Sequence, residues 1–203
     1  MVARASAKCA EARQLVRDSN ALLDGSAMGN GVAFQQKHRD LIVERAFMDV
    51  FEAFESYLES MFICYMMGQA GLNGASVVRY VMPINSEHAE KILCGKEQYV
   101  DFTSRQMIMK YADNFFQGGR PFTYLSNISQ DFEDMKKIRN EISHKSLKSR
   151  REFEGLVRSR IASMPPSITV ATFLLTTMPR GRMSFFTHYV DVVDGTIQSL
   201  ANP

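Results

Sequence analysis

Apolar residues recur at intervals of three and four over most of the chain, which is the spacing of a buried helix face. The longest such run covers residues 34–67, where Val43, Phe47, Phe54 and Phe62 fall on one side. At 1.5 Å per residue this helix would be about 50 Å long, which is typical of the backbone of a helical bundle. The same spacing predicts further helices over residues 5–23, 75–82, 86–94, 99–116, 127–145, 149–162 and 184–200.

One segment departs from this spacing. Residues 168–176, ITVATFLLT, are apolar, short and rich in β-branched side chains, which favours extended backbone. We therefore expect an all-α helical bundle with one short extended segment near 168–176. Residues 1–203 are expected to form a single domain, in which 1–33 are an N-terminal helix and linker and 34–200 are the core.

Composition narrows the class of protein. Apolar residues make up 45% of the chain and charged residues 23%, which is an ordinary globular balance. No apolar run reaches the roughly 18 residues of a membrane span, and the charged N-terminus lacks the apolar stretch of a secretion signal, so we expect a cytoplasmic protein without a membrane partner. Cys9, Cys64 and Cys94 are too far apart for a zinc pair, and we expect neither metal nor cofactor.

Charge is concentrated in one stretch of the sequence. The net charge is +2, yet residues 136–160 hold nine basic and three acidic side chains, so this stretch carries +6 and the rest carries −4. A local basic patch on a nearly neutral chain indicates an anionic partner, nucleic acid first among them. A solvated helix face is the alternative, and charge alone does not decide between them.

The segment DFEDMKKIRNEISHKS, residues 131–146, combines an apolar stripe with polar side chains. Arg139 falls within the arc of that stripe, where its charge requires a partner, an anion or a second subunit. Asn140 and His144 are four residues apart and hence neighbours on successive turns. A helix edge of this kind suits a site that is completed by the same helix of a second copy. The stripe consists of Ile128, Phe132, Met135, Ile138 and Ile142.

Residues 139–144, RNEISH, match the R-x4-6-H motif with a polar residue after the arginine, and the chain here resembles HEPN domains. The long helix with RAFMDVFEAFESYLESMF and the end FLLTTMPRGRMSFFTHYVDVVDGTIQSL are similar to HEPN-like proteins of bacterial nuclease and defence systems, over about residues 34–200. The resemblance implies a metal-independent endoribonuclease that forms a homodimer through the 127–145 helix. It also implies a toxin or antiviral role, with an antitoxin or defence-system partner. Ser146 stands where some HEPN toxins carry a modified tyrosine.

Cleavage of RNA without a metal is chemically reasonable for histidine, arginine and asparagine side chains. An imidazole with a reference pKa of about 6.5 exchanges protons near neutral pH, so His144 can serve as base on an RNA 2′-hydroxyl or as acid on the leaving 5′-oxygen. Arg139 would grip the scissile phosphate and Asn140 would orient the histidine or the phosphate, leaving 2′,3′-cyclic phosphate and 5′-hydroxyl ends. The alternative is a non-catalytic dimeric HEPN scaffold or RNA-binding subunit. The expected RNA-binding residues are Lys136, Lys145, Lys148, Arg150 and Arg151.

Overall fold

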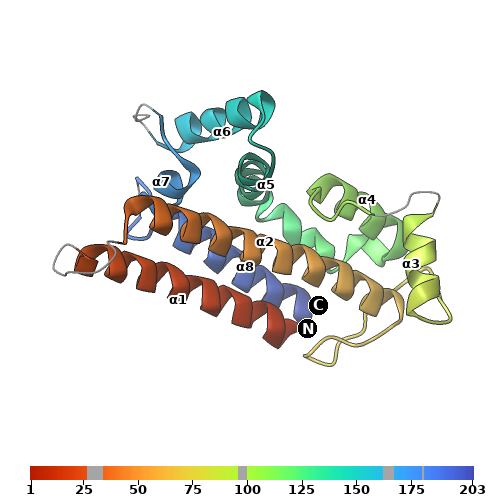
Figure 1. Ribbon diagram of the computed structural model, residues 1–203. Coiled ribbons are helices and arrows are strands. Elements are labelled where there is room, and N and C mark those ends of the chain that lie inside the picture. Colours follow the sequence, from red (N-terminus) through yellow and green to blue (C-terminus); the bar gives the residue numbers. More distant parts are fainter. Residues whose placement is uncertain (27–33, 96–99, 162–166, 180) are drawn as a thin grey trace. The chain divides into compact units, whose positions relative to one another are not determined.

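A computed structural model describes residues 1–26, 34–95, 100–161, 167–179 and 181–203. Within these ranges the chain is built of helices, and strand-like pairing is limited to two isolated bridges. No helix in the described part is long and apolar enough to cross a membrane. The all-α class expected from the sequence is therefore confirmed. The elements (Figure 1) are α1 (Val2–Ser26), α2 (Gln36–Met66), α3 (Ser86–Cys94), α4 (Arg105–Phe115), η1 (Gln117–Gly119), η2 (Phe122–Ser126), α5 (Ser129–His144), α6 (Leu147–Arg160), α7 (Val170–Leu175) and α8 (Phe185–Ala201).

The contacts within the chain group its residues into two compact units, each assembled from separate stretches of sequence. The first unit contains Met1–Ser6, Ala53–Glu133 and Asp194–Pro203, and the second contains Ala7–Glu52 and Asp134–Val193. Helices α1, α2, α5 and α8 each contribute residues to both units. The candidate site of the 131–146 segment lies almost wholly in the second unit.

Aromatic rings fill the core of the first unit. Phe62 of α2 is fully buried, and its ring centroid lies 6.0 Å from that of Phe102, 5.0 Å from Phe116 and 4.7 Å from Phe122. Such tilted and edge-on ring pairs bury large apolar areas and hold the surrounding short helices against α2. Tyr65, one turn further along α2, donates a 2.6 Å hydrogen bond to the Leu200 carbonyl and thereby ties α2 to α8.

The prediction of a helix over residues 75–82 is wrong. The backbone there is extended, and the Tyr80 N–H donates to the Phe115 carbonyl over 2.8 Å, next to an isolated bridge. Arg79 turns its guanidinium back to the Met66 carbonyl at the end of α2. The apolar spacing is compatible with either structure, and these tertiary hydrogen bonds favour the extended one over an isolated short helix, which is unstable alone.

A continuous series of rings forms the core of the second unit. Phe47 of α2 contacts Tyr189 of α8, with ring centroids 6.3 Å apart, and Tyr189 contacts Phe185 at 6.2 Å. Phe185 stacks on Phe173 of α7 at 4.4 Å, and Phe173 meets Phe153 of α6 edge-on at 5.7 Å. This series joins four helices, so the position of α6 is set by packing that starts on α2.

The prediction of an extended segment at 168–176 is also wrong, because the structure has helix α7 there. The side chain of Thr169 caps the helix by accepting a hydrogen bond from the backbone N–H three residues later, at 3.1 Å. Val170, Phe173 and Leu174 are buried, at the spacing of a helix face. Burial against the core therefore overrides the extended preference of the β-branched residues.

Candidate functional site at the end of helix α5

The apolar stripe expected in this segment faces the core in the structure. Phe132, Met135 and Ile138 of α5 are buried to within 1% exposure, whereas Ile142 is only half-buried. The stripe is therefore fully covered along the middle of α5 and partly open at its C-terminal end. The expected polar site residues sit beside that open end.

Arg139 is half-buried and is held by its neighbour in the sequence. One terminal guanidinium nitrogen donates a 3.2 Å hydrogen bond to the Asn140 side-chain oxygen. The Nε atom is buried and has no hydrogen-bond partner among the residues that the structure describes. A buried guanidinium N–H without an acceptor is costly, and an anion would have to bind through the terminal nitrogens of the guanidinium. The Asn140 side chain thus contacts Arg139, whereas the sequence pattern had paired Asn140 with His144.

His144 is the last residue of α5, and its side chain is exposed. The chain turns sharply directly after it, because Lys145 adopts a left-handed conformation, with φ at +46°. That position usually carries glycine at a helix end, and a side chain there costs about 1 kcal/mol. Ser146 then caps α6. The turn leaves the imidazole of His144 at a corner between two helices, accessible from solvent.

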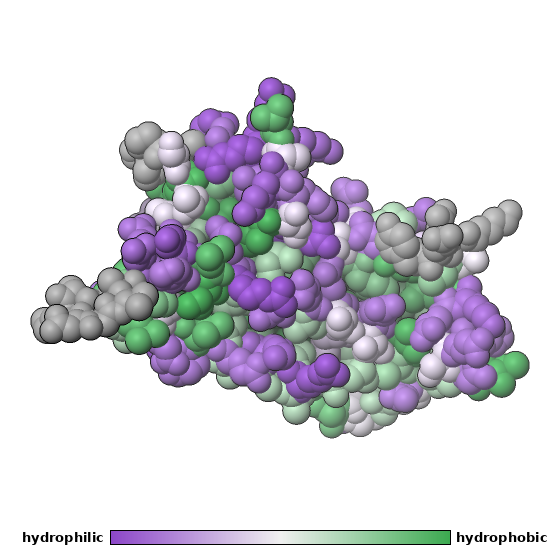
Figure 2. Space-filling view, viewed as in Figure 1, coloured by the Kyte–Doolittle hydropathy of each residue, from purple (hydrophilic) through white to green (hydrophobic). Residues whose placement is uncertain are grey.

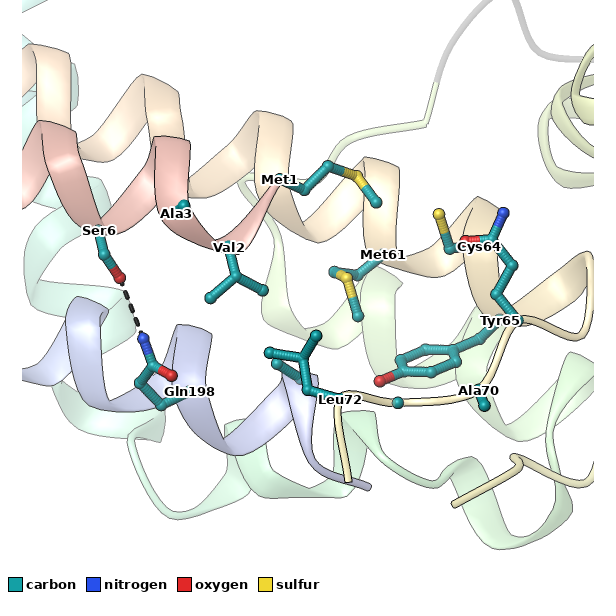
Figure 3. Close-up of a pocket in the computed structure, with 13 residues that line it drawn as sticks. Met1, Val2, Ala3, Ser6, Met61, Cys64, Tyr65, Ala70, Leu72 and Gln198 are labelled. Carbon is teal, nitrogen blue, oxygen red and sulfur yellow. Dashed lines mark hydrogen bonds between the residues drawn. The ribbon is translucent and has the colours of Figure 1, made fainter. Parts of the chain in front are cut away.

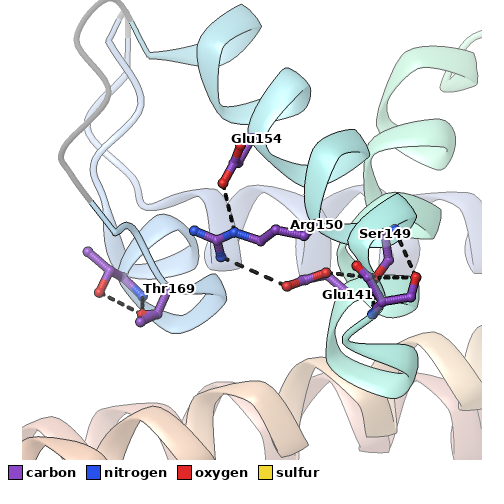
Figure 4. Close-up of polar contacts among 7 residues, drawn as sticks. Glu141, Ser149, Arg150, Glu154 and Thr169 are labelled. Carbon is purple, nitrogen blue, oxygen red and sulfur yellow. Dashed lines mark hydrogen bonds and ion pairs between the residues drawn. The ribbon is translucent and has the colours of Figure 1, made fainter.

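A polar network (Figure 4) fixes α6 against the end of α5. Glu141 of α5 is 8% exposed, and its carboxylate accepts a 2.8 Å hydrogen bond from the Ser149 hydroxyl. Ser149 in turn accepts the Ser146 N–H at 2.9 Å, while the Ser146 hydroxyl accepts the Ser149 N–H at 3.1 Å. This reciprocal capping box places the N-cap of α6 at Ser146, two residues after His144, so hydrogen bonds define the corner.

Arg150 belongs to the same network, although the sequence analysis placed it among the expected RNA-binding residues. Its Nε donates a 2.8 Å hydrogen bond to Glu154, and a terminal nitrogen lies 3.8 Å from the Glu141 carboxylate. The guanidinium also lies over the Phe153 ring, 5.7 Å from its centroid. Two carboxylates and an aromatic face occupy this cation, so its geometry favours a structural role.

The far end of α6 is anchored by a second buried ion pair. Asp134 of α5 is fully buried, and its carboxylate accepts hydrogen bonds from Arg160 Nε at 2.6 Å and Nη2 at 2.5 Å. Tyr189 of α8 lies 3.4 Å from the same carboxylate oxygen. Two carboxylates of α5 therefore hold α6 near its two ends, and Arg160 is withdrawn from the basic surface.

The cations that stay exposed on α6 form a stripe. Lys148, Arg151 and Arg158 are all exposed, and at 3.6 residues per turn they fall within about 80° of one another around the helix. Lys148 lies 3.9 Å from Glu152, and within the described parts of the chain Arg151 and Arg158 have no ion-pair partner. Figure 2 shows hydrophilic side chains gathered over α6. We call these three residues the α6 basic stripe; the charge count included Arg158, but the expected RNA-binding set did not.

The remaining expected RNA-binding residues, Lys136 and Lys145, lie on α5 and at the corner. Lys136 is half-buried within α5, eight residues before His144, whereas Lys145 is exposed immediately after it. Only Lys145 therefore adjoins both His144 and the start of the α6 basic stripe. Neither position was distinguished from the other by the sequence pattern.

Glu44 of α2 is a site neighbour that the sequence pattern did not indicate. Burial raises the pKa of this carboxyl, and Asp40 and Glu141 add to the shift, while Lys145 and a hydrogen bond from the backbone of Ala171 oppose it. Its carboxylate thus links the α5–α6 corner to the first turn of α7. Proximity to both segments is a consequence of the fold, because more than 90 residues separate them from Glu44.

No protein-family model, curated protein or solved structure matches the chain.

Proposed function

We propose that this chain is a metal-independent endoribonuclease whose reaction centre lies at the C-terminal end of α5. The observation that carries the proposal is Arg139, whose buried Nε has no acceptor in the described part of the chain and whose terminal nitrogen donates there to the neutral amide of Asn140. A phosphodiester would supply the opposite charge and acceptors for the terminal nitrogens of the guanidinium. The exposed imidazole of His144 stands at the end of the same helix, ready for proton transfer.

The reaction proposed here uses the nucleophile that RNA carries. His144 takes the proton of the 2′-hydroxyl while O2′ attacks phosphorus and forms the new P–O2′ bond. The P–O5′ bond breaks, and O5′ receives a proton from the protonated His144 of a second copy. Arg139 neutralises the charge that develops on the non-bridging oxygens. The products are a 2′,3′-cyclic phosphate and a 5′-hydroxyl.

A homodimer through α5 supplies the second histidine. Ile142 is half-buried next to the fully buried part of the stripe, so apolar surface stays open at the end of α5. Pairing of two such ends around a two-fold axis would cover Ile142 twice and place two Arg139–His144 sets in one cleft. A substrate phosphate would then lie between residues of both copies.

The α6 basic stripe and Lys145 provide the binding surface in this proposal. Exposed cations contact phosphates without reading bases, so they would hold an RNA strand with little sequence preference. Arg150 and Arg160 are excluded from this surface because carboxylates of the same unit occupy their guanidinium groups. Binding and proton transfer are therefore assigned to different residues and can be separated by mutation.

The test is RNA cleavage by the purified chain in the presence of a chelator. We expect fragments with 2′,3′-cyclic phosphate ends, and a loss of about 10²–10⁴-fold in rate for His144→Ala. Arg139→Ala should lose a comparable factor. His88→Ala, which changes an imidazole of α3 in the first unit, is the matched control and should cleave at the wild-type rate.

Two kinds of result would contradict the proposal. Cleavage at the wild-type rate by His144→Ala, or activity that disappears with chelator and returns with magnesium, would overturn the mechanism. RNA binding without cleavage by the wild-type chain would favour the alternative of a non-catalytic RNA-binding subunit.

A further inference from the structure

A cavity of about 460 Å³ lies in the first unit, apart from the residues of the proposed reaction. It is lined by the first turns of α1, the end of α2, the loop that follows α2 and the end of α8 (Figure 3). The lining is mainly apolar. Its volume is within the range of small-molecule sites, roughly 300–1,000 Å³. Met61 and Tyr65 of α2 form a buried wall, whereas Leu72 of the loop is exposed at the rim.

The walls of this cavity are held in place by contacts outside it. The Tyr65 hydroxyl donates to the Leu200 carbonyl at 2.6 Å, which prevents the ring from turning inward to fill the space. The Leu72 N–H donates to the Ala201 carbonyl at 2.8 Å. A Cβ at Gly71 would lie 2.2 Å from Pro203, so only glycine allows the loop to approach this closely. A preformed site of this kind loses little entropy on binding.

Small side chains leave the space open. Ala3 and Ala70 line the cavity and carry only a methyl group each, and Gly71 carries none. At about 30 Å³ for each water-sized group, the volume accommodates a molecule of roughly ten to fifteen non-hydrogen atoms.

The polar end of the cavity has a defined direction of hydrogen bonding. The Ser6 hydroxyl donates its single proton to Asp194 at 2.7 Å, so its oxygen accepts from the Gln198 amide nitrogen at 3.1 Å. This order fixes which way the Gln198 amide points, and its oxygen then lies on the cavity side in Figure 3. In the part of the chain that the structure describes, no donor is recorded for that oxygen.

We propose that this cavity binds a small uncharged amphipathic molecule, with an apolar body against Met61, Tyr65 and Leu72 and a hydroxyl or amide N–H that donates to the Gln198 oxygen. The apolar wall favours an apolar body because burial of apolar surface is favourable. The Gln198 oxygen at the end favours a group that donates a hydrogen bond. The site goes beyond the proposed nuclease activity, and neither depends on the other.

The experiment uses the full chain and three probes of similar size: octanamide, N,N-dimethyloctanamide, which lacks the N–H donor, and octanoate, which is charged. The reporter is the half-buried thiol of Cys64, which lines the cavity, and Cys94 of α3 is the internal control. Burial raises the pKa of both thiols, so both react slowly with iodoacetamide and protection is measurable. Modification of each cysteine is followed by mass spectrometry of its peptide.

We expect octanamide to slow modification of Cys64 with a Kd of about 0.1–10 mM and to leave Cys94 unchanged. The dimethyl amide and octanoate both lack a donor for the Gln198 oxygen and should bind roughly two- to tenfold more weakly, the net value of one hydrogen bond. Gln198→Leu should remove the preference for octanamide over its dimethyl form. Gln69→Leu, at another point of the lining, is the matched control and should retain it.

Ala3→Leu places a larger side chain in the cavity. This variant should abolish protection of Cys64 while the helical dichroism signal stays at the wild-type value. Equal protection by octanamide in the wild type and in Ala3→Leu would show that the probe binds elsewhere. No protection by any probe at its solubility limit would overturn the binding site itself. An unchanged preference in Gln198→Leu would overturn the role given to its oxygen.

Discussion

Replacement of the α6 basic stripe tests how RNA binding is distributed over the second unit. The variant combines Lys148→Gln, Arg151→Gln and Arg158→Gln in a His144→Ala background, so that binding is measured without cleavage. All three side chains are exposed, and their removal leaves both buried carboxylate contacts of α6 in place. Helical content and unfolding free energy should therefore stay near the parent values.

The magnitude follows from counterion release. Each contact with a phosphate of a single strand contributes about 0.7 to the slope of log affinity against log salt. Three contacts contribute about 2, which is roughly a 20-fold change in affinity between about 50 and 200 mM salt. The variant should accordingly bind more weakly at low salt and show a slope smaller by about 2. Fluorescence anisotropy with a labelled single-stranded RNA, repeated over a salt series, measures both quantities.

A second triple variant separates local contacts from net charge. Arg4→Gln, Arg17→Gln and Lys110→Gln remove the same charge from exposed positions on α1 and α4. Screening limits the reach of these charges to about 10 Å at 0.1 M salt, so the slope should change little. An unchanged slope in the α6 variant, or an equal loss in both variants, would refute the assignment of phosphate contacts to α6.

Three further variants test the buried polar groups. Arg160→Ala should lower the free energy of unfolding in urea by about 3 kcal/mol, because it leaves the carboxylate of Asp134 buried without this guanidinium, whereas the exposed neighbour Arg158→Ala should cost below about 0.5 kcal/mol. Arg150→Gln should lower the same free energy by about 1 kcal/mol and leave the salt slope of RNA binding unaltered; a slope reduced by about 0.7 would contradict its structural role. Burial raises the pKa of Glu44 above its ordinary 4.5, so the folded state is penalised above the raised pKa and the penalty disappears as pH falls below 4.5; Glu44→Gln should therefore unfold at higher temperature than the wild type at pH 7, and equal melting temperatures there would contradict the shift.

Local pattern predicted most of the helices. The three-four spacing placed the long helix over 34–67, and the structure has α2 at Gln36–Met66. The spacing wrongly predicted a helix at residues 75–82, and the β-branched residues wrongly predicted extended backbone at 168–176. A short apolar stretch is compatible with either structure. Such stretches are decided by the partners that they meet, the Phe115 carbonyl in the first case and the buried face of α7 in the second.

The sequence also predicted which residues would form the candidate site. Asn140 and His144 are one helical turn apart, so any helix over this segment makes them neighbours on its surface. The structure gives Arg139 its contact with Asn140 and leaves His144 exposed at the helix end. Catalytic competence stays a prediction, because it depends on a second copy and an RNA.

What the sequence alone determined is therefore the set of relations that act within a few turns of one helix: the apolar stripe of α5, the order of its polar residues and the surplus of basic residues after it. The tertiary structure decided which of those cations are available. Arg150 and Arg160 are paired with Glu154 and Asp134, while Arg158 stays exposed, although all three look alike in the sequence. The physical reason is that an ion pair depends on distances between side chains on different turns and helices, and these distances exist only once the helices have packed.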